Sequence, residues 1–453
     1  MGYNELVQYD RGAASYFSAI ADLPWAIWLD SGGRDRFDIL VADPICTVVT
    51  RGEVTEITTA DSTQTSQQDP LDILRNELSK HRIQGGAVPF SGGAVGYWSY
   101  DLSRRWINFP ARNVDRGQIP EMAIGIYDWA IVIDHQEKTA RLLSENTSPQ
   151  TAEKLLSVLQ RLRQGTPQQI SNFHISGKIH ANLTRQEYGA AFTQIHNYLN
   201  AGDCYQVNLA QTFIMQASGD ALAAYLKLRE ISPAPYSAFM NLPGMQILSA
   251  SPEKFLQLND RKVETKPIKG TRQRGMNEQQ DEQFKQDLKN NAKDRAENLM
   301  IVDLLRNDLS KSCQRSSVVV KKMFEIESYA NVHHLVSTIT GRLKPEQDAL
   351  SLFKNCFPGG SITGAPKKRA MEIIEQLEPQ RREIYCGAIG YIGWDGNMDT
   401  SIAIRTLTYE QGEIKFSVGG GIVADSNVDA EYQETLDKAA NMLHMLKHFG
   451  GEF

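Results

Sequence analysis

The sequence predicts an α+β fold with large antiparallel sheets. Segments with the apolar pattern of strands recur along the whole chain and helical segments lie between them, but no βαβ unit repeats at a fixed period. The 453 residues allow a large core, and contents of 41% hydrophobic and 23% charged residues are ordinary for a folded protein. We find no internal repeat and no low-complexity tract in the sequence.

The first part of the chain, residues 1–165, is predicted to be rich in strands. Apolar runs between turn residues predict strands at 24–29, 37–42, 46–50, 92–97 and 123–133. The run at 123–133 is apolar throughout, which favours one continuous buried strand. Asp69 before Pro70 predicts the start of a helix, because the carboxylate can cap the helix and proline suits its first position. Ser148 before Pro149 predicts a second helix in the same way.

The second part, residues 180–453, is expected to follow a linker at 165–179, which is polar and weakly periodic. Thr184 and Glu187 have the spacing of a capping box and predict the next helix. Further strands are predicted at 205–215, 237–242, 246–250, 262–269, 318–326 and 332–339, with three more around a turn at 395–397. Further helices are predicted at 291–307, at 348–355, after a glycine loop at 358–367, and at 429–445.

Charge and cysteine content argue against several classes of protein. A formal net charge of −6 disfavours a nucleic-acid binder, because phosphate contacts need concentrated lysine and arginine. The five cysteines are scattered and form no Cys-x-x-Cys pair, which favours a reducing compartment over disulfides or a zinc site. No apolar run approaches the length of a membrane span, and the start carries no signal pattern. We therefore expect a cytoplasmic protein that binds neither nucleic acid nor membrane.

Lys269 is the first candidate catalytic residue. It follows Pro267, which stiffens the end of a predicted strand, and precedes Gly270, where the missing side chain lets a planar substrate approach the backbone. A lysine is a nucleophile only as the free amine, and we expect burial to lower the pKa of Lys269 towards neutrality. The alternative is a solvated lysine in a basic turn.

Four carboxylates form two pairs on predicted helices. Asp294 and Glu297 are three residues apart on one helix, and Glu431 and Glu434 are three apart on the last one, so the members of each pair share a face. If the two helices meet, these oxygen ligands suit Mg²⁺, with water completing its octahedron. The alternative is two solvated acidic faces.

Two glycine-rich segments offer free backbone amides to an anion. The loop at 358–367, which contains Ser361 and Thr363, enters a helix, and the second segment, 417–421, follows Arg405, whose guanidinium can clamp a carboxylate. The first loop lacks the Gly-Lys-Ser/Thr step of a nucleotide-binding P-loop. Tight turns are the commoner use of glycine and stay open as the alternative.

Glu253 and one histidine complete the candidate chemistry. Glu253 follows a predicted strand and can act as a general acid if burial raises its pKa. His333 and His334 are neighbours in a predicted strand, so only one of them faces a given cleft, and a packed, hydrogen-bonded histidine is the alternative. Together the clusters indicate a magnesium-dependent enzyme for a small polyanion.

Three long motifs resemble those of the chorismate-utilising enzymes, and the resemblance extends over essentially the whole chain. The motifs are KDRAENL at 293–299, PGGSITGAPK at 358–367 and DTSIAIRT at 399–406. The resemblance implies a fold like that of anthranilate synthase component I. In that fold two intertwined halves form a large β-sandwich wrapped by helices, with the active-site cleft between the sheets.

Two positions distinguish members of this family. Anthranilate synthases have alanine at the position of Lys269, whereas aminodeoxychorismate synthases have lysine; isochorismate and salicylate synthases have a water-activating lysine at the position of Gln206. The resemblance therefore implies synthesis of 4-amino-4-deoxychorismate from chorismate and ammonia, a step towards 4-aminobenzoate and folate. The open alternatives are component I of an anthranilate synthase and a catalytically silent, tryptophan-binding regulatory subunit.

The resemblance also implies roles for individual residues. Lys269 adds to C2 of chorismate, Glu253 protonates the departing C4 hydroxyl and His334 orients it. Glu297 and Glu434 hold Mg²⁺. The residues that act on this metal through water are Asp294 and Glu431. The substrate-binding residues are Arg405, Tyr385, Gly419, Gly420, Gly421, Lys438, Ser361, Thr363, Gly270 and Thr271.

The same resemblance implies a partner and a second ligand site. The chain has no Gly-x-Cys-x-Gly nucleophile segment, so we expect ammonia to come from a separate glutamine amidotransferase subunit, component II. The family also contains a pocket for L-tryptophan, for which ordinary sandwich packing without a ligand is the alternative. The matching positions are Ser31, Asp35, Arg36, Phe37, Pro235, Tyr236 and Ser237.

Overall fold

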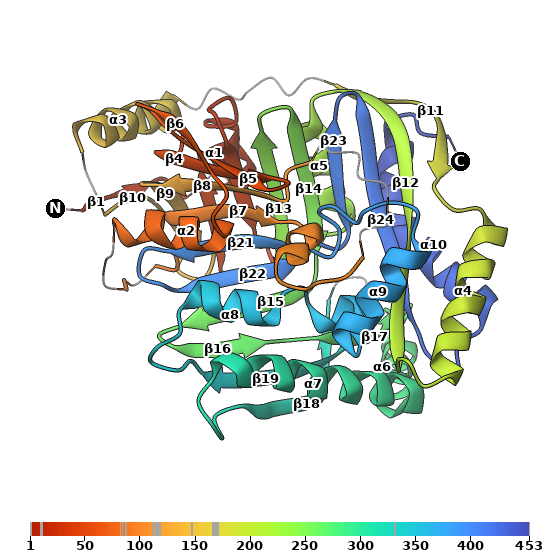
Figure 1. Cartoon of the computed structure of the whole chain (residues 1–453). Helices are drawn as coiled ribbons and strands as arrows, with labels where there is room; N and C mark the ends of the chain where they lie inside the picture. The colour runs from red at the N-terminus through yellow and green to blue at the C-terminus, as the bar shows by residue number, and fades with distance from the viewer. Residues whose placement is uncertain are drawn as a thin grey trace.

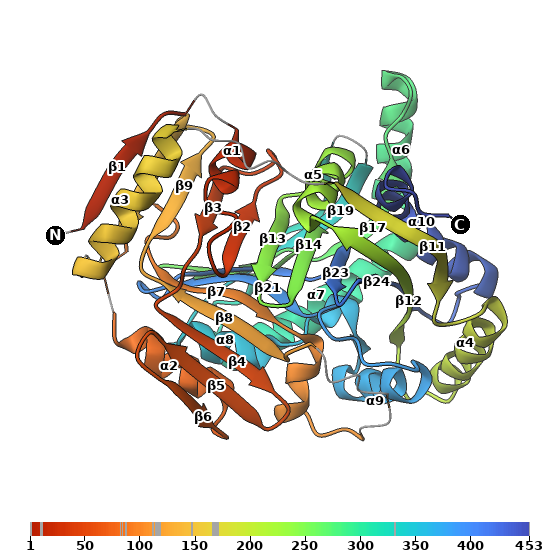
Figure 2. The ribbon, with the colours of Figure 1, turned by 90° about the horizontal axis from the view of Figure 1, so that it is seen from above.

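Two large antiparallel sheets of twelve strands each form the frame of the protein (Figure 1 and Figure 2). This computed structural model describes residues 2–9, 12–81, 83, 85–86, 88–110, 113, 119–145, 148–164, 172–329 and 332–452. Each sheet combines strands from early and late parts of the chain. The predicted α+β class with large antiparallel sheets is therefore confirmed.

The first sheet has the strand order β1-β10-β9-β3-β2-β13-β14-β23-β24-β12-β11, and β20 pairs with β12. In this order, the strands span Tyr3–Val7, Thr139–Ser144, Ala130–Asp134, Phe37–Val41, Ala26–Asp30, Tyr236–Leu242, Met245–Ser251, Thr406–Glu410, Glu413–Ile422, Gln206–Gly219 and Phe173–Ala181, with β20 at Gly364–Ala365.

The second sheet has the order β17-β19-β16-β15-β22-β21-β7-β8-β4-β5-β6, and β18 pairs with β19. In this order, the strands span Ile268–Gln273, Val332–Arg342, Lys262–Thr265, Lys254–Asn259, Met398–Ile402, Ala388–Gly393, Gly93–Trp98, Met122–Tyr127, Cys46–Arg51, Val54–Thr59 and Thr63–Ser66, with β18 at Val319–Ser328.

Helices cover the faces of the sheets that do not face each other. Tyr225 of α5 and Met442 of α10 pack in the core cluster of the first sheet, and Ile301 of α7 and Phe353 of α8 pack in that of the second. The α-helices are α1 Ala13–Ser18, α2 Pro70–Ser79, α3 Pro149–Gln164, α4 Arg185–Asn200, α5 Ala221–Ile231, α6 Glu278–Asn290, α7 Ala292–Ser312, α8 Ala349–Cys356, α9 Lys367–Leu377 and α10 Val428–His448. Short 3₁₀ helices lie at Tyr100–Arg105 and Gly360–Ile362.

A third core cluster joins strands of both sheets. Ile27 and Ile247 of the first sheet pack with Val95 and Tyr97 of the second, and all four side chains are fully buried. Each fully buried large apolar side chain contributes roughly 1.5–3 kcal/mol of free energy, so this layer contributes much of the stability of the packing between the sheets.

Two connections pass side by side from one sheet to the other. β14 in the first sheet leads into β15 in the second, and β22 in the second leads into β23 in the first. Because β14 pairs with β23 and β15 pairs with β22, the two connections are neighbours. Glu253 lies in one and Arg405 in the other, so the fold brings both residues to the junction of the sheets.

Local signals in the sequence are confirmed where they rest on a few adjacent residues. Asp69 caps α2 by accepting a hydrogen bond of 2.9 Å from the Leu71 amide. Thr184 and Glu187 form both hydrogen bonds of the predicted capping box at the start of α4.

Three sequence predictions are wrong in part. The run at 123–133 is two strands, because the chain crosses from β8 in the second sheet to β9 in the first at Asp128 and Trp129, and burial on both sides keeps it apolar. Residues 173–179 of the expected linker belong to β11 (Phe173–Ala181), a half-exposed edge strand, while 165–171 lie outside the described residues. The strand expected at 262–269 is divided at Lys266 and Pro267 into β16 and β17.

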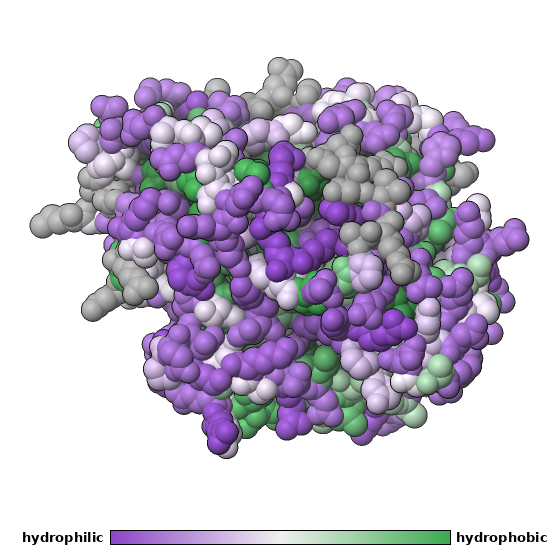
Figure 3. Space-filling view, in the orientation of Figure 1, coloured by the Kyte–Doolittle hydropathy of each residue, from purple (hydrophilic) through white to green (hydrophobic). Residues whose placement is uncertain are grey.

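Three α-helices were not anticipated: α1, α5 and α6. α1 has only six residues. α5 is mostly apolar and therefore lacks the amphipathic pattern of a surface helix, whereas α6 is almost entirely polar and projects from the body of the molecule (Figure 2). No described helix is long and apolar enough to cross a membrane. Figure 3 shows a mainly hydrophilic face with apolar residues in small patches.

Candidate active site

Lys269 lies in β17 and points towards the glycine loop that precedes α9. Its side chain is 12% exposed, and Nζ is 3.1 Å from Glu297 Oε1. Nζ also donates a hydrogen bond of 2.9 Å to the carbonyl oxygen of Ser361. The next residue, Gly270, has φ +81°, and a Cβ there would lie 3.0 Å from Asp294 Cγ, so this position needs glycine both for its backbone conformation and for space.

The expectation of an uncharged lysine is wrong for the free protein. Burial by itself lowers the pKa of Lys269, but the charges of Glu297 and Glu253 and the hydrogen bond with Glu297 outweigh it and raise the pKa above its usual value. Burial likewise opposes ionisation of Glu297, but Lys269 and Gln206 lower its pKa overall. Lys269 is therefore an ammonium ion paired with a carboxylate.

Glu253 is buried at the junction of the sheets, with 5% of its surface exposed. Ser361 Oγ donates a hydrogen bond of 2.7 Å to Glu253 Oε1. Burial raises the pKa of Glu253, although the Ser361 hydroxyl and the charge of Lys269 act against this. A raised pKa favours the protonated carboxyl that a general acid requires.

His334 and His333 point to opposite sides of β19, as the strand predicts. His334 Nδ1 is 2.9 Å from Thr271 Oγ1, and burial, assisted by Arg405, lowers the pKa of His334 to about 3, so its ring is neutral. His333 Nε2 instead lies 2.9 Å from Asp281 Oδ1 on α6. His334 can orient a hydroxyl near Thr271 but carries no charge there.

The two acidic helices, α7 and α10, meet around the glycines of β24. A Cβ at Gly420 would lie 3.1 Å from Glu431 Oε2 and 3.6 Å from Glu434 Oε1, and a Cβ at Gly421 would lie 3.1 Å from Glu297 Oε1. Bare glycines therefore leave a cradle between three carboxylates. Oxygen-only donors around such a space fit a hard cation such as Mg²⁺.

In this structure each carboxylate of the set is paired with a basic side chain. The nitrogen–oxygen pairs are Lys269 with Glu297 at 3.1 Å, Lys438 with Glu434 at 2.7 Å, Lys293 with Glu431 at 3.6 Å and Arg272 with Asp294 at 3.0 Å. Within the described residues, no group of three or more His, Cys, Asp or Glu side chains is drawn together as metal ligands. The negative charge of each carboxylate is therefore balanced by a basic side chain.

Several expected substrate-binding residues converge beside this cradle. Lys438 Nζ donates a hydrogen bond of 2.9 Å to the Gly419 carbonyl oxygen, and a Cβ at Gly419 would lie 3.0 Å from Tyr385 Oη. Arg405 has no ion pair within the described residues, and burial lowers the pKa of its guanidinium. A half-buried cation without a carboxylate partner suits an anionic substrate group.

The hydroxyl of Thr363, which was expected to bind substrate, instead bonds within its own loop. Thr363 is fully buried, and its Oγ1 donates a hydrogen bond of 3.0 Å to the Gly359 carbonyl oxygen within the same loop. This contact stabilises the loop that presents Ser361. Gln206, in turn, donates a hydrogen bond of 2.6 Å to Glu297 and so orients a carboxylate.

A family model described as chorismate binding enzyme matches residues 26–444. The chain belongs to this chorismate-binding enzyme family. It is 48% identical over 442 residues to aminodeoxychorismate synthase component 1 of Escherichia coli (strain K12), covering 96% of both chains. It is 36% identical over 466 residues to anthranilate synthase component 1 of Pseudomonas aeruginosa, covering 98% of this chain and 94% of the relative.

A solved structure of the same family supports the fold. The crystal structure of anthranilate synthase component I from Streptococcus pneumoniae superimposes with a TM-score of 0.82 at 31% identity, covering 90% of this chain and 92% of the other. The expected anthranilate synthase-like sandwich is therefore confirmed for this member of the chorismate-binding enzyme family.

The residues expected around a second ligand line one cavity of about 430 Å³. Its wall contains all seven positions, Ser31, Asp35, Arg36, Phe37, Pro235, Tyr236 and Ser237. Asp399 and Tyr391 also line it and were not anticipated as part of it. Asp399 belongs to the third motif of the chorismate-binding enzymes, so the motif marked it, but nothing in the sequence placed it next to Ser31 or Tyr236.

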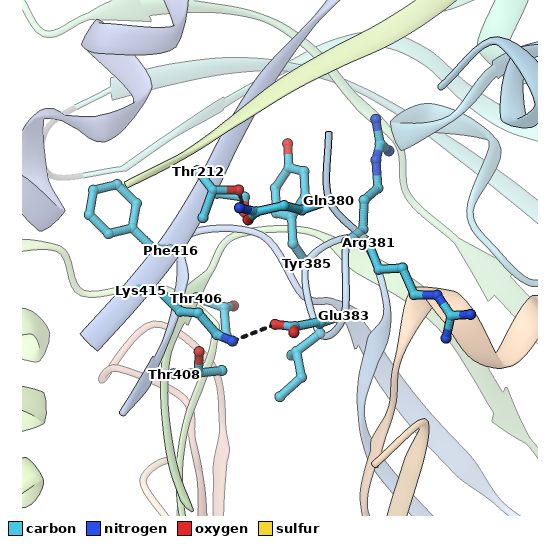
Figure 4. A pocket seen from close by; sticks show the side chains of 12 residues that line it. Thr212, Gln380, Arg381, Glu383, Tyr385, Thr406, Thr408, Lys415 and Phe416 are labelled. Atoms are coloured by element: carbon cyan, nitrogen blue, oxygen red, sulfur yellow. Dashed lines mark hydrogen bonds and ion pairs between the residues drawn. The ribbon is translucent and has the colours of Figure 1, made fainter. Parts of the chain in front are cut away.

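Tyr385 also lines a smaller cavity of about 30 Å³ (Figure 4). Glu383 and Lys415 face each other across it at 2.7 Å, and Lys415 also contacts Glu410 at 3.0 Å. Lys269 does not line this cavity. The ion pairs instead hold the loop of Tyr385 against β23 and β24.

Proposed function

We propose that this enzyme converts chorismate and ammonia into 4-amino-4-deoxychorismate. The observation that carries the proposal is the position of Lys269, whose buried amine contacts Ser361 and Glu297 and whose charge acts on Glu253. Anthranilate synthases have alanine there. The identity of 48% with an enzyme named aminodeoxychorismate synthase component 1 supports the same reaction.

Two successive displacements account for the product. In the first, the free amine of Lys269 bonds to C2, the ring double bonds shift, and the C4–O bond breaks. Glu253 donates a proton, so the hydroxyl leaves as water, and the new C–N nitrogen gives up a proton that restores the carboxyl. His334 orients the departing hydroxyl.

In the second displacement, ammonia bonds to C4, the double bonds shift back, and the C2–N bond to Lys269 breaks. The nitrogen that arrives from ammonia gives up one proton, and Lys269 takes one as it leaves. The two steps together exchange the hydroxyl for an amino group at C4 and release one water.

Lys269 must lose its pairing with Glu297 before it can react. As an ammonium ion it has no lone pair to donate, and the carboxylate holds that proton in place. Once the charge of Glu297 is engaged elsewhere, burial is left as the main influence, and burial favours the neutral amine.

The cradle beside Gly420 and Gly421 supports a divalent cation in the reaction. Mg²⁺ would be held by Glu297 and Glu434, with Asp294 and Glu431 acting through water. When bound, such a cation draws electron density from the ring through the substrate carboxylate.

Anion recognition is assigned to residues next to this cradle. Arg405 and Lys438 supply positive charge, while Tyr385 and the amides of residues 419–421 supply hydrogen-bond donors. Gly270 and Thr271 line the approach beside Lys269. These groups fix the two carboxylates of chorismate, which orients C2 towards the amine.

The ammonia is proposed to come from a glutamine amidotransferase subunit. The name component 1, carried by the relatives, supports a second component. The chain itself has no Gly-x-Cys-x-Gly segment. All five cysteines are buried and free, in agreement with the cytoplasmic location that this proposal includes.

The cavity of about 430 Å³ is proposed to take L-tryptophan. Its size suits a small aromatic ligand, and its wall combines aromatic rings with charged groups. Calorimetric titration of the protein with tryptophan tests this, and an absence of binding at millimolar ligand would contradict it.

A chromatographic assay with chorismate, Mg²⁺ and ammonium tests the reaction. We expect 4-amino-4-deoxychorismate without anthranilate or pyruvate. Formation of anthranilate would favour the anthranilate synthase reaction, and tryptophan binding without any turnover would favour a regulatory subunit.

A further inference from the structure

The charges around the cradle are balanced inside the protein. Four carboxylates on α7 and α10 face four basic side chains, so a divalent cation that entered alone would leave two uncompensated positive charges. Three of the basic side chains are at least a quarter exposed: Lys293 is 54%, Lys438 42% and Arg272 27% exposed. These three can turn towards water when a cation arrives.

Lys269 differs from the other three. Its side chain is 12% exposed, its partner Glu297 is 18% exposed, and Nζ is also fixed by the Ser361 carbonyl oxygen. A cation bound by Glu297 would therefore lie close to the ammonium group of Lys269 in a largely buried site. Repulsion between like charges is strong there, because little water is present to screen it.

We propose that the Lys269 ammonium competes with the divalent cation for Glu297. In the free enzyme the ammonium group occupies Glu297 and so weakens metal binding. The metal binds tightly only after a substrate with two negative charges has bound and compensated the positive charge. By linkage, metal and substrate then raise each other's affinity by the same factor. This inference rests on the proposed function, because it assumes the metal site and the dianion.

Binding of Mn²⁺ to the full-length protein without substrate tests the competition. The free ion is measured by electron paramagnetic resonance, and Mn²⁺ serves as a probe of an oxygen site. We expect Lys269→Met to bind Mn²⁺ on the order of tenfold more tightly than the wild type, because this variant lacks the ammonium group that repels the cation. Lys269→Gln, which keeps a hydrogen-bond donor but no charge, should behave in the same way.

Lys266→Met is the matched control. Lys266 is three residues from Lys269 but pairs with Glu327 at 2.6 Å, away from the acid set. Lys266→Met removes the same charge from the same part of the chain as Lys269→Met. An effect of net charge alone would therefore change the Mn²⁺ affinity of both variants equally. We expect its Mn²⁺ affinity to stay within about twofold of the wild type.

Glu297→Gln separates failure of this inference from failure of the proposed function. If that variant binds Mn²⁺ weakly while folded Lys269→Met and Lys269→Gln bind no more tightly than the wild type, the competition is overturned and the metal site stands. If Glu297→Gln binds as the wild type does, the metal site assumed in the proposed function is wrong and the inference falls with it.

The coupling with substrate gives a second readout. In a Glu253→Gln background, which removes the general acid and so prevents turnover, we expect chorismate to raise Mn²⁺ affinity on the order of tenfold. With Lys269→Met added, the gain should be several-fold smaller. An equal gain in both backgrounds would contradict the proposal.

Discussion

Lys269 and Glu253 are held by the same residue: the carbonyl oxygen of Ser361 accepts a hydrogen bond from Lys269 Nζ at 2.9 Å, and its hydroxyl donates one to Glu253 at 2.7 Å. The proposed nucleophile and the proposed acid are therefore positioned by one turn of the glycine loop. A displacement of that loop would therefore disturb a contact of both groups at once.

Ser361→Ala is expected to move the pH profile of the reaction. A general acid works while it is protonated, so activity falls as the pH rises through the pKa of Glu253. The Ser361 hydroxyl stabilises the carboxylate and lowers that pKa, so its removal raises the pKa and shifts the basic limb of kcat/KM to higher pH.

The profile is measured between about pH 6 and 10, a range that covers both limbs of such a reaction. Ser310→Ala is the control, because Ser310 lies on the exposed side of α7 and, within the described residues, its hydroxyl donates to the Asn307 carbonyl oxygen of the same helix. A basic limb that stays in place, or moves to lower pH, in Ser361→Ala would be evidence against Glu253 as the acid.

Lys269→Ala is expected to lose the covalent intermediate. Incubation of the wild type with chorismate and no ammonia should add the mass of chorismate less one water to the peptide that contains Lys269, and Lys269→Ala should show no such addition. With ammonium as donor, we expect its turnover to fall at least about tenfold. Turnover at the wild-type rate without an adduct would show that the lysine is not the nucleophile.

Local features of this site could be predicted from the sequence. The spacing of Glu431 and Glu434 fixes them on one face of α10 whatever the rest of the chain does. Alternation along β19 likewise determines that His333 and His334 point apart. Such features depend on a few neighbouring residues and on the period of one element.

The electrostatic state of the site could not be predicted in this way. Lys269 and Glu297 are far apart in sequence and meet only because β17 packs on α7. Burial alone predicts a neutral amine, and only the tertiary structure reveals the carboxylate that reverses the shift. The crossing at Asp128 was missed for a related reason, since residues buried in two different sheets look like one apolar run.

Arg382 is expected to be a major contributor to stability near the site. It is 5% exposed, its Nη2 pairs with Glu378 at 2.7 Å, and it donates hydrogen bonds to the carbonyl oxygens of Ile362 and Asn208. Arg382→Met would leave the Glu378 carboxylate buried without its cation, and we expect a loss of about 3–5 kcal/mol in the free energy of unfolding.

Urea denaturation measures this loss. Arg306→Met is the control, because Arg306 pairs with Asp303 on the surface, where the two side chains are 50% and 63% exposed. Such a pair contributes about 1 kcal/mol or less. An Arg382→Met variant as stable as this control would show that Glu378 is satisfied by other groups.

Asp399→Asn is expected to stabilise the protein more at high pH than at low pH. Asp399 Oδ2 accepts a hydrogen bond of 2.9 Å from Gln257, but Oδ1 is buried without a partner, and burial raises the pKa of the carboxyl from 3.8 to about 7. The folded state therefore binds this proton more tightly than the unfolded state. This tighter binding of the Asp399 proton contributes fully to the free energy of unfolding below about pH 4, and the contribution is lost as the pH rises to about 7.

The asparagine side chain stays neutral at every pH, so the variant avoids that loss. Relative to the wild type, its free energy of unfolding should increase by about 3–4 kcal/mol between about pH 4 and pH 8, measured by urea denaturation at each pH. Asp303→Asn on the surface of α7 is the control and should show a much smaller change. A difference between Asp399→Asn and the wild type that does not vary with pH would mean that Asp399 titrates normally in the folded protein.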